Sequence, residues 1–314
     1  MSDTIEGMNR IDVDNGVLYE RTERTSSCLI VFVHGVFGNP DATWKDFPRF
    51  ILQSPEAGYA DGALFHYETP VLSRTVSVES CATLLRSWLM VRCHKYRHVV
   101  VLAHSLGGLV SKRCLIDLFL NASAEARELR QKLRLFFLYA VPHHGSHVGN
   151  LASAFLRKNQ LAQDLSLNSL SQQAINKTIR ELKSTTAATG ERFPRFKIVF
   201  GIKDSVVEQS SAIPNEGAIE DSADLPAVDA DFVLAVDATH GSIVKPQSAD
   251  ETSVVALRQQ IDSICGMDSN PVWDPLSTYF QRALELYQSQ EVANGFVAPA
   301  RALRPWPVRG AVWR

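Results

Sequence analysis

Three residues with the chemistry of a nucleophile, an acid and a base stand in separate short loops of this sequence. Ser105, Asp204 and His240 each follow a run of apolar residues. A serine hydroxyl is a poor nucleophile until a base removes its proton, and a histidine acting as that base needs an acceptor that fixes its tautomer. Their types and chain order therefore predict a nucleophile, an orienting acid and a general base for attack on a carbonyl carbon.

Other residues compete for two of these roles. The chain has nine histidines, of which His34 lies in a glycine-containing loop and His104 directly precedes the nucleophile. We expect the side chain of His104 to point away from the pocket. Glu208 is a weaker alternative for the acid, and Asp237 is too close in sequence to the base to be favoured.

A tetrahedral intermediate needs two N–H donors about 3 Å from its negatively charged oxygen. One candidate donor is the backbone amide of Leu106, at the start of the helix expected after the nucleophile. The other is the amide of Val36 or Phe37, because Gly35 lets that loop turn its amides inward. The sequence therefore predicts an oxyanion hole built from two loops.

The elements that position these loops follow from the hydrophobic pattern. Continuous apolar runs predict strands buried on both faces, and apolar residues at helical spacing predict helices. Strands are expected at 17–19, 28–33, 63–67, 99–101, 133–141, 196–202 and 231–236, and helices at 79–93, 106–121, 147–190 and 250–264. This alternation indicates an open, mostly parallel sheet with helices on both faces, whose ligands gather at the carboxyl ends of the strands.

Five segments together resemble a known family. They are His34-Gly35 after an apolar run, Ala-His-Ser-Leu-Gly-Gly at 103–108, Val-Pro-His-His-Gly-Ser at 141–146, Gly-Ile-Lys-Asp at 201–204, and His-Gly-Ser-Ile-Val-Lys-Pro at 240–246. In this order they resemble the serine esterase/lipase branch of the α/β-hydrolase superfamily, and are similar to GPI inositol-deacylase-like and lipase-like serine esterase domains. Ala103 replaces the usual first glycine of the nucleophile motif.

The resemblance implies an α/β-hydrolase fold, with a mostly parallel sheet, helices on both faces and a helical cap-like insertion. We expect a lead-in at 1–27, the hydrolase domain at 28–265 with a candidate cap at 147–195, and a C-terminal helix and tail at 266–314. The last fourteen residues hold four Arg, two Trp and no acid. A solvated tail is the simpler interpretation, and contact with a partner protein or an anionic membrane surface is the alternative.

Composition gives little support to several other classes of protein. The net charge of −2 over 314 residues gives no indication of nucleic-acid binding. No run of 18 apolar residues predicts a membrane span, and the polar N-terminus does not resemble a signal peptide. The five cysteines lack close pair spacing, so we expect buried thiols rather than disulfides. We therefore expect a cytoplasmic protein.

His143, His144 and His147 could together hold zinc, although no acid or cysteine stands nearby as a further ligand. We expect His143 instead to brace the nucleophile loop, and we expect the chemistry to need no metal or organic cofactor.

The predicted function is a serine esterase or lipase that cleaves carboxylic esters, with lipid or acyl esters implied by the resemblance. It would act through an acyl-enzyme. Two alternatives remain at this point: a non-catalytic binding module of the same fold, and a lipase-like effector domain gated by a partner.

Overall fold

The computed structural model describes residues 5–23, 25–36, 38–58, 60–69, 76–143, 170–207, 212 and 233–269. The chain divides into two units, Met1–Gly266 and Met267–Arg314, and the sheet described below belongs to the first. His144, His147, residues 147–169 of the candidate cap, Glu208 and the basic tail lie outside the described residues.

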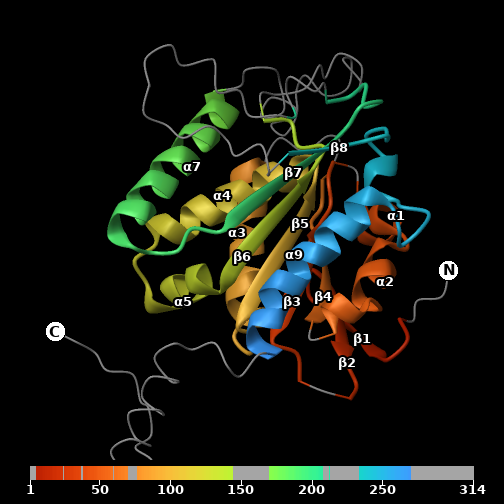
Figure 1. Cartoon of the computed structure of the whole chain (residues 1–314). Helices are drawn as coiled ribbons and strands as arrows, with labels where there is room; N and C mark the ends of the chain where they lie inside the picture. Colours follow the sequence, from red (N-terminus) through yellow and green to blue (C-terminus); the bar gives the residue numbers. More distant parts are fainter. Residues whose placement is uncertain are drawn as a thin grey trace, which may run out of the picture. The chain divides into compact units, whose positions relative to one another are not determined.

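Eight strands form one sheet in the order β1-β2-β4-β3-β5-β6-β7-β8 (Figure 1). From β4 to β8 the neighbouring strands are parallel, whereas β1 and β2 add an antiparallel hairpin at one edge. The predicted mostly parallel sheet is therefore confirmed. The strands are β1 (Met8–Val13), β2 (Gly16–Arg21), β3 (Cys28–Val33), β4 (Ala60–Phe65), β5 (His98–His104), β6 (Leu133–Tyr139), β7 (Arg195–Gly201) and β8 (Val233–Val236).

Helices cover both faces of this sheet (Figure 1). The side chains of β3 alternate between the two faces, so that Val31 packs into one apolar core and Ile30 into the other. The first core contains α3 (Val78–Arg92), α4 (Leu106–Leu120), α5 (Ala124–Lys132) and α7 (Leu170–Thr189), and the second contains α1 (Pro40–Trp44), α2 (Phe47–Leu52) and α9 (Thr252–Ser269). A strand buried on both sides needs no polar residue, which explains its continuous apolar run.

Several short elements do not appear in the sequence prediction. The edge strand β1 alternates irregularly between buried and exposed residues and forms by pairing with β2. The helix α1 has only five residues and begins with an Asn39 cap followed by Pro40. The helix α5 is mostly polar and begins where the Ser123 side chain accepts a hydrogen bond from the amide of Ala126. Caps and edge pairing, rather than an apolar run, specify these elements.

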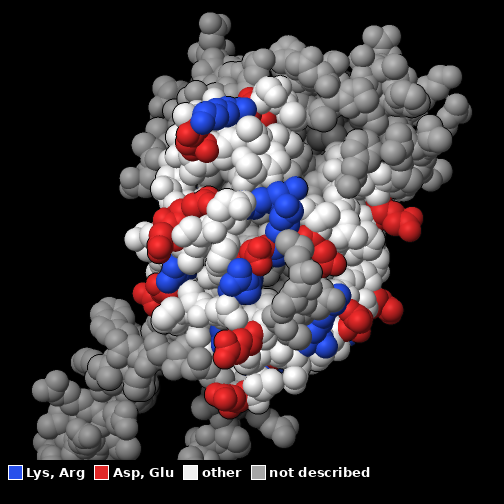
Figure 2. All heavy atoms as spheres, turned by 90° about the vertical axis from the view of Figure 1, so that its right-hand side faces the viewer, with Lys and Arg blue, Asp and Glu red and all other residues white. Residues whose placement is uncertain are grey.

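The face shown in Figure 2 carries acidic and basic side chains of both signs, interspersed rather than segregated. Within the described residues, no helix has the length and apolar character needed to cross a membrane. All five cysteines are buried thiols, as the sequence predicts.

The first turn of α4 packs directly on the end of β3, and this contact requires a glycine. A Cβ atom added at Gly107 would collide with the backbone oxygens of Val33 and His34. Backbone atoms cannot move aside as a flexible side chain can. This glycine therefore lets the helix start close enough to β3 for their two loops to meet.

We expect Gly107→Ala to lower the free energy of unfolding by about 1–3 kcal/mol, because the added methyl group overpacks the contact. In an ordinary helix interior the same change stabilises by about 1 kcal/mol, so the sign is diagnostic. Gly241→Ala is the control, since a Cβ there meets no atom within 4 Å. Urea unfolding measures both variants, and a Gly107→Ala protein as stable as the wild type would contradict the packing argument.

Candidate active site

Ser105 occupies the corner where β5 turns into α4. Its backbone has a φ of 53° and a ψ of −123°, a conformation that non-glycine residues rarely adopt and that costs on the order of 1–3 kcal/mol. Its amide donates a hydrogen bond to the carbonyl of Tyr139, at the end of β6, with an N–O distance of 2.9 Å. The strained corner thus presents the hydroxyl at the carboxyl edge of the sheet.

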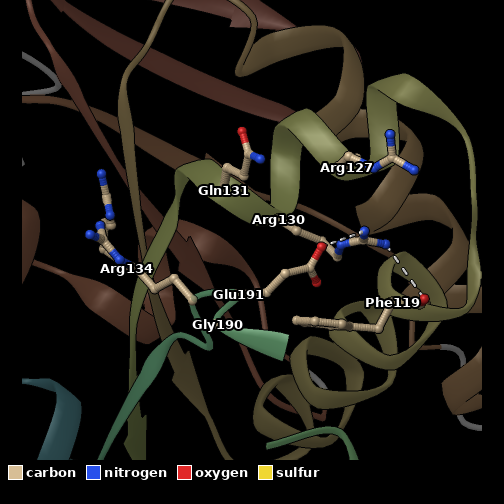
Figure 3. Close-up of a pocket in the computed structure, with 8 residues that line it drawn as sticks. Phe119, Arg127, Arg130, Gln131, Arg134, Gly190 and Glu191 are labelled. Carbon is tan, nitrogen blue, oxygen red and sulfur yellow. Dashed lines mark hydrogen bonds and ion pairs between the residues drawn. The ribbon is translucent and has the colours of Figure 1, made fainter. Parts of the chain in front are cut away.

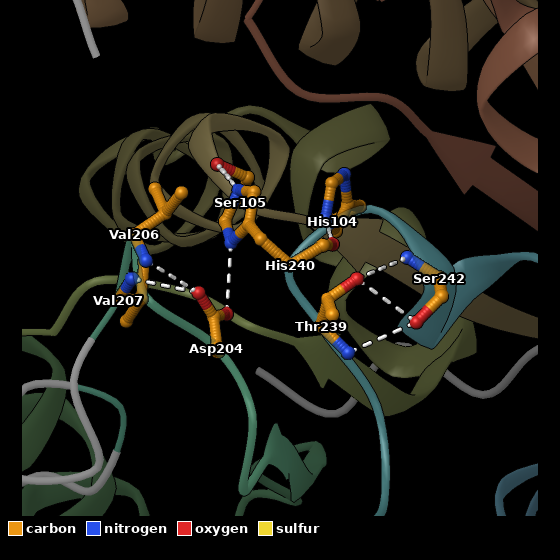
Figure 4. A network of polar contacts seen from close by, with 8 residues as sticks. All are labelled: His104, Ser105, Asp204, Val206, Val207, Thr239, His240 and Ser242. Carbon is orange, nitrogen blue, oxygen red and sulfur yellow. Dashed lines mark hydrogen bonds and ion pairs between the residues drawn. The ribbon is translucent and has the colours of Figure 1, made fainter. Parts of the chain in front are cut away.

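The structure brings the three predicted residues together in one line of hydrogen bonds (Figure 4). The Nε2 atom of His240 lies 3.1 Å from Oγ of Ser105, and its Nδ1 atom lies 2.9 Å from Oδ2 of Asp204. Both distances are within hydrogen-bond range. One imidazole therefore touches the serine hydroxyl with one nitrogen and the carboxylate with the other.

The carboxylate of Asp204 is held in place by more than the histidine. Its Oδ1 atom accepts hydrogen bonds from the amides of Val206 (2.8 Å) and Val207 (2.9 Å). Burial by itself would raise the pKa of Asp204, but the hydrogen bond and attraction from His240, together with the two amides, outweigh it and lower the pKa. The group is therefore a charged acceptor at neutral pH.

Hydrogen bonds hold the loop that carries His240 in place. The amide of Thr239 donates to Oγ of Ser242 (2.9 Å), and the amide of Ser242 donates back to Oγ1 of Thr239 (3.3 Å). The Nε2 atom of His104 lies 2.9 Å from the backbone oxygen of His240, and the two rings are 4.8 Å apart. The ring of His104 therefore lies against the loop that carries His240, and the expectation that it points away from the pocket stays a prediction.

Two buried histidines near the site are neutral. Burial, followed by the proximity of His240, lowers the pKa of His104 to about 3, so the ring is neutral. In this neutral ring the Nε2–H group donates a hydrogen bond to the carbonyl of His240. Burial likewise lowers the pKa of His34 to about 4. The ring of His34 stacks on Tyr67 with centroids 4.4 Å apart, and its Nδ1 lies 2.8 Å from the oxygen of Gly35. Both rings brace loops rather than exchange protons with Ser105.

The two predicted oxyanion loops meet at the nucleophile. A Cβ atom added at Gly35 would lie 2.9 Å from the Cβ atom of Ser105, so the loop after β3 lies against the corner. Val36 follows in this loop and is half-buried, whereas Phe37 lies outside the described residues. Leu106 is the first residue of α4, where an amide has no acceptor within the helix.

A buried polar cluster behind the site was missed by sequence reasoning. Lys112 in α4 is only 4% exposed, and its Nζ atom contacts Nδ1 of His143 and donates to Oδ1 of Asn176 (2.9 Å). Asn176, in α7, donates in turn to the oxygen of His143 (2.5 Å). His143 thus lies against α4 and α7, and what it contributes to the nucleophile loop stays a prediction.

The spacing of residues along α4 could have predicted that Lys112 is buried. Lys112 shares the buried face of α4 with Gly108, Leu115 and Ile116, although a lysine is normally assigned to the solvent. Burial lowers its pKa from 10.5 to about 7, and the charge of Arg180 contributes in the same direction.

Within the described residues, no three His, Cys, Asp or Glu side chains are placed to hold a metal ion. Two of the three histidines considered as zinc ligands, His144 and His147, lie outside those residues, so the zinc site stays untested.

Comparison with known proteins places the chain among hydrolases. A family described as “Putative serine esterase (DUF676)” matches residues 23–204, more than half of the chain. No curated protein matches the sequence. None of the matches bears on the likeness to GPI inositol-deacylase-like domains, which stays a prediction.

A solved lipase structure shares this architecture. The mature lipase BlEst2 of Bacillus licheniformis superposes with a TM-score of 0.54 at 15% identity, over 78% of this chain and 96% of that one. Carboxyl esterase 2 of the mycorrhizal fungus Tuber melanosporum gives 0.49 at 14% identity, over 83% and 86%. At such identity the likeness to the lipase shows the fold alone, and that fold is the predicted α/β-hydrolase fold.

We expect the buried amine of Lys112 to make stability depend on pH. Between pH 7 and 10.5 the unfolded chain holds this proton more tightly than the folded chain, so the free energy of unfolding rises with pH. Below about pH 7 both states are protonated and the cost of burying the charge is complete. The wild type should therefore gain up to about 1.4 kcal/mol per pH unit relative to Lys112→Met over this interval.

Urea unfolding of both proteins across that pH interval measures the difference, with the exposed Lys177→Met as the control for loss of a lysine. A difference between wild type and Lys112→Met that stays constant with pH would show that the amine is not buried as a charge-sensitive group.

Proposed function

The chain belongs to the family described as “Putative serine esterase (DUF676)”, and we propose that it is a serine hydrolase that cleaves carboxylic esters through an acyl-enzyme. The observation that carries the proposal is the unbroken contact from Asp204 through His240 to Ser105, at 2.9 and 3.1 Å. A nucleophile, a base in bonding reach and a group that orients the base are the parts that this chemistry needs.

In the acylation step, Oγ of Ser105 attacks the ester carbonyl while Nε2 of His240 takes the hydroxyl proton. Asp204 accepts a hydrogen bond from the Nδ1–H group of His240, which leaves Nε2 free to act as the base, and its negative charge stabilises the imidazolium. The new C–O bond gives a tetrahedral oxyanion. When this collapses, the bond to the alcohol breaks and the imidazolium returns its proton to the departing alkoxide.

The oxyanion would be held by two backbone amides. Leu106 contributes the free amide at the start of α4, where the helix dipole also favours a negative charge. Val36 or Phe37 contributes the other from the loop that lies against Ser105. Losing one such donor typically costs about 10²–10³ in rate.

In the deacylation step, His240 removes a proton from water, whose oxygen attacks the acyl carbon. A second tetrahedral intermediate forms, and its collapse breaks the bond to Oγ of Ser105. The imidazolium gives its proton back to Oγ, and the carboxylic acid leaves. The residues return to their starting states, so the proposed cycle consumes only ester and water.

The neutral state of His104 supports the choice of His240 as the base. A charged ring 4.8 Å away would oppose the imidazolium that forms in both steps. Because burial lowers the pKa of His104 to about 3, this neighbour stays neutral at the pH at which His240 works. His104 therefore positions the catalytic ring without repelling its charge.

Lipid or long-chain acyl esters are the substrates that the family resemblance favours. Short-chain esters and thioesters would use the same residues, and acyl transfer would differ only in replacing water by another nucleophile. A panel of p-nitrophenyl esters with graded acyl chains ranks these substrates, with Ser105→Ala as the background.

We expect a fluorophosphonate probe to label the wild-type protein and not Ser105→Ala, because only an activated serine attacks the probe. Ser87→Ala is the matched control, since this serine lies on α3 and bonds only to the carbonyl of Thr83 in the contacts described. Gel fluorescence or intact mass measures labelling. A folded wild type that takes up no probe would instead favour a binding module of the same fold.

We expect Asp204→Asn to lower kcat by about 10³–10⁴-fold, since an amide leaves His240 in the wrong tautomer and without a counter-charge. Asp237→Asn is the control, because Asp237 is exposed and pairs with Lys203 at 2.6 Å rather than with the histidine. Hydrolysis of p-nitrophenyl butyrate measures both. An Asp204→Asn enzyme whose rate stays close to that of Asp237→Asn would remove Asp204 from the mechanism.

A further inference from the structure

A pocket lined by arginines lies at the other end of the sheet from Ser105. This arginine pocket has a volume of about 390 Å³, and its lining includes Arg127, Arg130, Arg134, Arg192, Glu191 and Phe119 (Figure 3). Pockets that hold small molecules in proteins begin at about 300 Å³. The pocket is therefore large enough for a small ligand.

Four segments form the pocket where β6 and β7 begin. They are the last turn of α4, the helix α5, the start of β6 at Arg134, and residues 190–192 between α7 and β7. The catalytic residues lie at the carboxyl ends of the strands, and β6 alone spans seven residues between the two edges, about 20 Å. The pocket is thus separate from the proposed hydrolytic site, and a ligand in it would not contact Ser105.

The charge in the pocket is strongly one-sided. The lining contains four arginines and one carboxylate, that of Glu191, whose Oε1 atom is 4.0 Å from Nη2 of Arg130. In the part of the chain that the structure describes, the side chains of Arg127 and Arg192 have neither a hydrogen bond nor an ion pair. Arg134 uses its Nε atom to donate to Nδ1 of His98 (2.9 Å), which leaves its two terminal nitrogens available.

One arginine is held rigidly at the base of this group. Arg130 donates from Nη1 to the oxygens of Leu118 (2.9 Å) and Asn121 (3.2 Å), at the C-terminal end of α4. Its guanidinium lies 5.1 Å from the ring centroid of Phe119. A fixed guanidinium over an aromatic wall loses little freedom when a ligand arrives, which favours binding.

We propose that the arginine pocket binds a small phosphate ester, an anion with about two negative charges. The planar fork of a guanidinium matches two phosphate oxygens at once, and a lining with four arginines and one acid suits a multiply charged anion better than a single carboxylate. Phe119 contributes an apolar part to the lining. The phosphate ester can be a soluble metabolite or the headgroup of a phospholipid, since both present the same chemistry.

Titration calorimetry of the full chain with glycerol 3-phosphate tests the soluble form. Arg127→Gln/Arg192→Gln removes the two guanidiniums that have no partner, and both side chains are exposed, so the fold should persist. Each charge-assisted hydrogen bond contributes about 1.5–3 kcal/mol, so we expect the double variant to bind at least about tenfold more weakly.

The matched control is Arg49→Gln/Lys177→Gln. It removes the same two positive charges from outside the pocket, at side chains that pair with Asp46 and Glu181 in their own helices. We expect this control to bind glycerol 3-phosphate as the wild type does. Equal weakening in both double variants, or no binding by the wild type at millimolar ligand, would overturn the proposal.

Co-sedimentation with phosphatidylcholine vesicles, with and without phosphatidic acid, tests the headgroup form. The pocket variants are combined here with Ser105→Ala, so that hydrolysis of the lipid cannot affect the result and a failure of the proposed function leaves this test intact. Binding that needs phosphatidic acid and is lost with the two arginines identifies a lipid headgroup. Binding of glycerol 3-phosphate alone identifies a soluble ester, and binding of neither refutes the site.

Discussion

A single backbone corner constrains this whole molecule. At Ser105 the chain passes from strand to helix with a positive φ, a conformation that an isolated chain would abandon. The surrounding structure holds it there: Tyr139 accepts the serine amide, Gly35 lies against the serine, and Gly107 lets α4 start over the end of β3. The burial of β3 and β5, which are packed on both faces, offsets the cost of this strained conformation. The position of the Ser105 hydroxyl is thus a product of the core beneath it.

Register in the parallel sheet converts this corner into a site. The strands β5 and β6 end in register, and β7 and β8 end in register two residues further on, so loops that are far apart in the chain leave the same edge of the sheet. Asp204 and His240 follow neighbouring strands, whereas Ser105 follows β5, two strands further along. His240 must therefore reach back across the sheet. The Thr239–Ser242 pair and the His104 ring hold its loop in that position.

The parts of this arrangement that could be predicted are those that have a local signature. Apolar runs identified β3, β5 and β6, and chain order identified Ser105, Asp204 and His240 as a set. The contact of His104 could not be predicted in this way, because it depends on a loop that returns 136 residues later. The burial of Lys112 was not predicted for a different reason. A lysine is normally expected in solvent, and only its position on the buried face of α4 places it inside the protein. The polar helix α5 depends on its cap and on tertiary packing, neither of which hydrophobicity reports.

The strand that precedes His240 is the shortest and least buried one in the described sheet. In the described sheet β8 has four residues, none of them buried, and pairs only with β7. Edge elements with few apolar contacts open by local fluctuation well before the core melts. Heat inactivation should therefore begin as fraying of this edge while the far-ultraviolet circular dichroism stays native. The time for which the protein stays active would then be set by how often the β8 edge opens, and not by its global melting temperature.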